Sequence, residues 1–174
     1  MTKNLKLGIM MFLQYAVWGA WMPVTSRFLT ASVMDGGLGF TDSQMAIILG
    51  FAASIGALSA PFIAGQVADR YFSTEKILAF LVISGGLVKW YTALQTDFNA
   101  WLYLSILYSI LYMPTLALSN SIAFAHLEDS ENNFPKIRAW GTIGWIVATW
   151  TFPMIWLQTN LGLSLIHISE PTRP

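Results

Sequence analysis

Three residues toward the C-terminal end of the chain have side chains suited to holding a small polar molecule with a flat ring. Arg138, Thr142 and Trp145 follow one another at i, i+4 and i+7 within KIRAWGTIGW, residues 136–145. At about 100° per residue they share one face of a helix. A guanidinium donates to carbonyl or hydroxyl oxygens, and an indole stacks on a ring. Arg138 can equally be a positive anchor at a membrane surface, and the spacing alone favours the anchor.

A second polar and aromatic stripe lies near the N-terminus. Gln14, Trp18, Trp21 and Thr25 follow at i, i+4, i+7 and i+11, again on one helical face. A glutamine inside an apolar helix is costly unless it has a partner or a wet cavity. It can therefore line a site, or it can bond to another helix while the aromatic residues face lipid. The spacing does not decide between these.

A third stripe predicts packing rather than chemistry. Tyr108, Tyr112, Thr115 and Ser119 lie on one face around Pro114, whose missing N–H leaves a carbonyl for polar neighbours to satisfy. No paired carboxylates, Ser–His–Asp set or phosphate loop is visible inside any apolar stretch, so we expect no enzyme activity. The chain has no cysteine and two histidines, and we expect neither a metal nor a cofactor.

The elements that carry these stripes are predicted to lie in a membrane. Of 174 residues, 55% are hydrophobic and only 10% charged, whereas soluble domains carry about 25% charged residues. The net charge is +0, so nothing indicates a nucleic-acid partner. Because a membrane-crossing helix needs about 20 mostly apolar residues, the sequence predicts an all-α polytopic protein in the lipid bilayer. Five spans are expected, at residues 7–26, 45–68, 77–94, 101–124 and 137–157.

Caps and charges support these spans. Thr41 with Gln44 three residues on predicts a capping box before the second span. Lys89 is expected to extend outward to the membrane surface beside Trp90. The remaining basic residues favour a cytoplasmic N-terminus. With five alternating helices, one side collects Lys3, Lys6, Arg70, Lys76, Lys136 and Arg138, whereas the opposite side has Arg27.

The last residues follow neither a helical nor a loop pattern. Residues 163–173, LSLIHISEPTR, match the translation of a transposase adapter used in short-read sequencing libraries. Residues 163–174 are therefore expected not to be native, and residues 1–162 to be part of an N-terminal transmembrane bundle. A natural amphipathic tail is the alternative.

A family resemblance rests on four segments. GQVADR, residues 65–70, resembles the loop motif of the major facilitator superfamily through Gly65, Asp69 and Arg70, but lacks the second glycine and the basic run that follow. FLQYAVWGAW, YMPTLALSNSIAF and FPKIRAWGTIGW occur in the right order and on the right spans. With them, residues 3–157 resemble the bacterial nucleoside:proton symporters of that superfamily.

This resemblance implies a fold, an activity and a site. The fold would be twelve helices in two six-helix halves, of which this chain holds five helices of the N-terminal half. The protein would be a monomer of the bacterial inner membrane that imports nucleosides with protons, and the fragment alone would be inactive. Arg138, Thr142 and Trp145 would bind substrate, and so would Gln14 and Trp18, which match the family pattern in the first span. Gly65, Asp69 and Arg70 would act in the loop that latches the two halves.

Two questions stay open at the level of sequence. No Asp or Glu lies inside the spans and arginine stays protonated, so we expect the proton-carrying group in the missing half. The alternatives to a nucleoside symporter are a major facilitator carrier for another polar solute, such as a sugar, and a membrane scaffold subunit that transports nothing.

Overall fold

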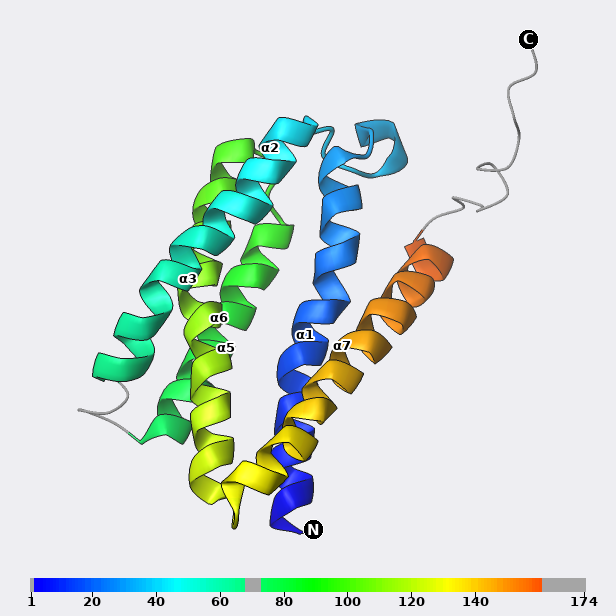
Figure 1. The fold of residues 1–174 in the computed structure, drawn as a ribbon. Helices are drawn as coiled ribbons and strands as arrows, with labels where there is room; N and C mark the ends of the chain where they lie inside the picture. The colour runs from blue at the N-terminus through cyan, green and yellow to red at the C-terminus, as the bar shows by residue number, and fades with distance from the viewer. Residues whose placement is uncertain (1, 68–72, 161–174) are drawn as a thin grey trace.

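The computed structural model describes residues 2–67 and 73–160, and the regular secondary structure within these ranges is helical throughout (Figure 1). The chain begins with α1 (Lys3–Thr30) and a short 3-10 turn, η1 (Val33–Asp35). A second long helix follows, in which two π-helical turns interrupt the α-helical hydrogen bonding. Its parts are α2 (Asp42–Ala46), η2 (Ile47–Phe51), α3 (Ala52–Phe62) and η3 (Ile63–Val67). The remaining helices are α5 (Thr74–Ala93), α6 (Phe98–His126) and α7 (Ser130–Asn160).

Four helices among the described residues are long and apolar enough to cross a membrane. They are Lys3–Thr30, Asp42–Gly65, Thr74–Ala93 and Phe98–His126, at the positions of the first four predicted spans. The fifth predicted span falls within α7, a helix of 31 residues that is not among these four. That α7 crosses the membrane remains a prediction. Because α7 begins at Ser130, seven residues before the predicted span, Pro135 lies inside the helix.

Local signals set several helix ends. The predicted capping box is confirmed: the N–H of Gln44 donates to Thr41 Oγ1 at 3.3 Å, and the N–H of Thr41 donates to Gln44 Oε1 at 2.9 Å. Asp97 caps α6, since its Oδ2 accepts from the N–H of Ala100 at 3.0 Å. Both caps satisfy backbone donors that a helix start leaves unpaired. Ser73 occupies the cap position of α5 without a side-chain hydrogen bond.

The helices pack as two groups that meet along α1 and α6. In Figure 1, α7 runs beside α1, while α3 and α5 lie against α6. Glycines permit the close α1–α7 contact. A methyl group at Gly144 would collide with the backbone of Phe12, and one at Gly141 would stand 2.7 Å from the ring of Tyr15. Gly141 and Gly144 thus admit the neighbouring helix, and this contact brings the α1 and α7 stripes together.

Candidate functional site

A groove between α1 and α7 contains four of the five predicted substrate residues. Its volume is about 290 Å³. The side chains of Arg138, Thr142 and Trp145 enter it from α7, and Trp18 enters it from α1. The sequence singled out neither of the other two lining residues, Tyr15 and Met22. We call this space the α1–α7 groove.

The arginine of the α1–α7 groove is held by an aromatic ring and not by an acid. The guanidinium carbon of Arg138 lies 4.1 Å from the centroid of the Tyr15 ring, a cation–π arrangement. Tyr15 is itself buried, with 8% of its surface exposed. Within residues 2–67 and 73–160, Arg138 forms no ion pair and no side-chain hydrogen bond. Its N–H donors therefore remain available to a molecule in the groove.

The other walls of the α1–α7 groove are aromatic. The ring of Trp18 meets that of Trp145 edge to face, with centroids 5.0 Å apart and an angle of 67° between the planes. Thr142 is exposed and lies one turn from both Arg138 and Trp145. The arrangement combines fixed guanidinium donors, one hydroxyl and two indoles. Such a set can hydrogen-bond the polar edge of a flat ring or a sugar and pack against the ring itself.

Gln14 does not line the α1–α7 groove. Its Nε2 donates to Thr115 Oγ1 on α6 at 2.6 Å, and its backbone oxygen accepts from the hydroxyl of Tyr112 at 2.6 Å. Gln14 is 7% exposed and Thr115 is fully buried. Both interpretations left open by the sequence hold in part: Gln14 bonds to another helix and also lines a second, larger cavity, while Trp18 and Trp21 line cavities and do not face lipid. We call this cluster of Gln14, Tyr112 and Thr115 the α1–α6 clamp.

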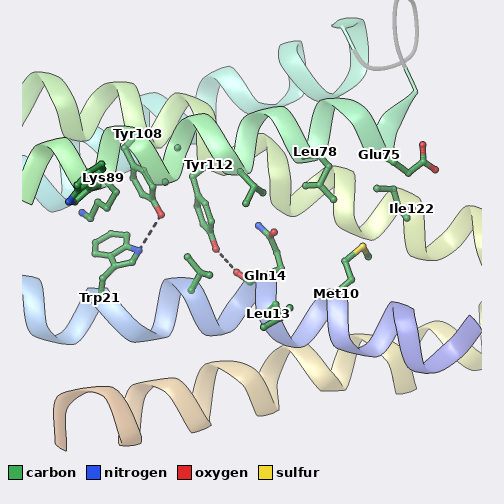
Figure 2. A pocket seen from close by; sticks show the side chains of 16 residues that line it. Met10, Leu13, Gln14, Trp21, Glu75, Leu78, Lys89, Tyr108, Tyr112 and Ile122 are labelled. Carbon is green, nitrogen blue, oxygen red and sulfur yellow. Dashed lines mark hydrogen bonds between the residues drawn. The ribbon is translucent and has the colours of Figure 1, made fainter. Parts of the chain in front are cut away.

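A larger cavity, of about 670 Å³, lies between α1, α5 and α6 (Figure 2). Gln14, Trp21, Tyr108 and Lys89 are among its lining residues. The ammonium of Lys89 stands 3.6 Å from the centroid of the Trp21 ring and 5.1 Å from that of Tyr108. Lys89 thus reaches across to α1, and the expectation that it extends outward is wrong. The indole face of Trp21 attracts the cation inward. The contact could not be predicted from the sequence because Lys89 and Trp21 lie on different helices.

The predicted gating motif is only partly within the described residues. Gly65 lies in η3, and a methyl group placed on it would meet nothing within 4 Å. Asp69 and Arg70 lie outside the described residues. Within the described ranges, no group of three or more His, Asp or Glu side chains could hold a metal ion.

Comparison with known proteins decides the family. The model of the nucleoside H+ symporter family matches residues 1–169. The chain belongs to this family. The nucleoside H+ symporter resemblance drawn from the four sequence segments is thereby confirmed.

Two curated relatives match most of the chain. YegT of Escherichia coli K12 is 40% identical over 148 residues, which make up 85% of this chain and 33% of the relative. The xanthosine permease of the same strain is 33% identical over 166 residues, or 92% of this chain and 38% of the relative. The chain thus spans between a third and two fifths of these relatives.

A solved structure shows the same arrangement of helices. The crystal structure of the nucleoside transporter NupG, a D323A mutant, superposes with a TM-score of 0.79 and 29% identity. The match covers 90% of this chain and 39% of NupG. The predicted fold class, an all-α polytopic membrane protein that forms part of a major facilitator fold, is confirmed.

Proposed function

We propose that the full-length protein is a secondary active transporter that imports nucleosides together with protons. The observation that carries the proposal is the α1–α7 groove, where Arg138 is fixed over Tyr15 beside two indoles. A nucleoside presents ring carbonyls, sugar hydroxyls and a flat base, and the groove offers a matching partner for each. Membership in the nucleoside H+ symporter family supports the same conclusion.

In this proposal the residues of the α1–α7 groove share three roles. Arg138 and Thr142 donate hydrogen bonds to the base or the ribose, and Trp145 and Trp18 pack against the base. Tyr15 holds the guanidinium in place through its ring face. Gln14 acts on the groove indirectly, by fixing α1 against α6 and not by touching the substrate.

The remaining parts of the proposal concern the whole protein. We propose that it is a monomer in the bacterial inner membrane with a cytoplasmic N-terminus, as the basic residues favour. The motif of Gly65, Asp69 and Arg70 would then lie on the cytoplasmic side, where it helps to hold the two halves together. Neither a cofactor nor a nucleic acid takes part.

The test is uptake of radiolabelled uridine by cells that carry the complete gene with Arg138→Ala. A hydrogen bond to a charged group contributes about 1.5–3 kcal/mol, which corresponds to a loss of roughly 10- to 100-fold in affinity. Arg27→Ala is the matched control, because Arg27 is exposed at the end of α1 and outside the groove. Uptake that stays undiminished in Arg138→Ala, with equal amounts of protein in the membrane, would refute the site.

Two other functions are distinguished by the same assay. A competition panel of unlabelled nucleosides and sugars against labelled uridine separates a nucleoside carrier from a sugar carrier, since only nucleosides should compete. A membrane scaffold would give no saturable uptake with any solute. The groove favours nucleosides because two indoles beside a guanidinium suit a planar, polar base better than a sugar alone.

A further inference from the structure

Lys89 is a cation inside the bundle whose charge no carboxylate balances within the described residues. Its ammonium stands over Trp21, with Tyr108 at 5.1 Å and the ring of Trp101 at 5.7 Å. Three rings from α1 and α6 thus surround one amine from α5. Figure 2 shows Lys89 at one end of the large cavity, beside Trp21 and Tyr108.

The other charged or titratable groups around Lys89 are few. α6 contributes the phenols of Tyr108 and Tyr112. Lys89 lines the large cavity and also a smaller one between α1, η2, α3 and α6, and the residues of α1, η2 and α3 that line these two cavities carry no ionisable side chain. On α5, Glu75 lines the opposite end of the large cavity, 14 residues away, or about 21 Å along the helix. The amine therefore responds mainly to the rings and to water.

Two opposing effects act on this amine. A poorly hydrated environment disfavours the ammonium form, whereas the faces of aromatic rings favour it. A small change in water access or in the position of Trp21 then shifts the balance between ammonium and amine. Lysine suits such a role, because an ammonium can lose its proton and a guanidinium does not.

A continuous path of packed rings joins Lys89 to the α1–α7 groove. From Trp21 it passes to Tyr108 with centroids 5.5 Å apart, and from there to Tyr112 at 5.4 Å. Tyr112 lies 6.5 Å from Trp18, which meets Trp145 at 5.0 Å. The first contact also has a hydrogen bond, from Trp21 Nε1 to the Tyr108 hydroxyl at 3.2 Å. Trp21 and the α1–α7 groove are thus joined by an unbroken series of neighbouring rings.

We propose that Lys89 carries the coupling proton, in place of the group that the sequence led us to expect in the missing half, and that the ring path links its charge to substrate binding. This rests on the proposed nucleoside symport. The neutral amine accepts one proton from water on one side of the membrane, and the ammonium releases that proton to water on the other side. No other reactant takes part. Protonation draws the amine onto Trp21, and by reciprocity a nucleoside against Trp18 and Trp145 changes the affinity of Lys89 for the proton.

The experiment uses the full-length protein in proteoliposomes with two readouts. Nucleoside counterflow needs no net proton movement, whereas accumulation driven by an imposed pH gradient does. Lys89→Arg keeps a cation over Trp21 but cannot release its proton, so we expect retained counterflow and complete loss of gradient-driven accumulation. Lys89→Met should show the same loss. Lys76→Arg, on an exposed position of the same helix, is the matched control and should keep both activities.

Two results with Lys89→Arg would contradict the role of Lys89 in proton coupling. Gradient-driven accumulation by Lys89→Arg would overturn the proposal, because a permanent cation would then suffice. Loss of counterflow as well in Lys89→Arg would also overturn it, because Lys89 would then be needed for binding or folding and not for coupling. Counterflow by the unmodified protein is measured first. Its absence would refute nucleoside transport itself, so the two failures are distinguishable.

Discussion

Replacing Gln14 tests whether the α1–α6 clamp stabilises the protein without contacting substrate. Gln14→Leu keeps a similar side-chain size and removes the donor to Thr115 Oγ1. Hydrogen bonds between membrane helices contribute on average about 0.6 kcal/mol and at most about 1.7 kcal/mol. The short 2.6 Å distance and full burial of Thr115 place this one in the upper part of that range. We expect Gln14→Leu to lower the free energy of unfolding by about 1 kcal/mol.

The partner variant should cost more. Thr115→Val removes the acceptor but leaves the amide of Gln14 buried without it, and an unsatisfied buried group costs about 1–3 kcal/mol. In the double variant both polar groups are removed, so neither is left buried without its partner. The losses in the free energy of unfolding of the two single variants should therefore add up to about 1 kcal/mol more than the loss in the double variant, as expected for residues in direct contact.

The assay is unfolding of the full-length protein by SDS titration in mixed micelles, with uridine binding measured alongside. Gln14→Leu should weaken stability and leave affinity nearly unchanged, the opposite of Arg138→Ala. Additive effects of the two single variants would refute the hydrogen bond. A Gln14→Leu protein of normal stability that no longer binds uridine would refute the structural role, and would return Gln14 to the substrate site.

Three further predictions follow from the groove and the helix contacts. Tyr15→Leu should raise the KM for uridine a few-fold, since a cation–π contact contributes about 0.5–2 kcal/mol. Tyr103→Leu, which replaces an exposed ring, is the control. An unchanged KM in Tyr15→Leu would refute the role of Tyr15. Gly144→Ala should destabilise the protein by about 1–3 kcal/mol because its methyl group meets the backbone of Phe12, whereas Gly50→Ala meets nothing; equal stability of the two would contradict the close α1–α7 contact. Thr142→Val should reduce the affinity for uridine. Thr151→Val should not, because the Thr151 hydroxyl donates to the backbone oxygen of Val147 on its own helix. Equal losses of affinity in the two variants, measured by uridine binding, would show that Thr142 is not part of the site.

The sequence by itself determined the helices and what each of them displays. Apolar stretches of membrane length and local caps such as Thr41 with Gln44 act within a few residues, so their outcome does not depend on the rest of the chain. The same holds for the shared face of Arg138, Thr142 and Trp145, which follows from the helical period alone.

Only the tertiary structure decided which way the polar side chains on those helices point. Gln14 turns to Thr115, which lies 101 positions away, and Lys89 turns inward because Trp21 presents a ring face to it. Tyr15 became a groove residue only when the glycines of α7 let that helix approach α1. Inside an apolar bundle a polar group goes where a partner is, and the partner's position is fixed by helix packing and not by spacing along the chain.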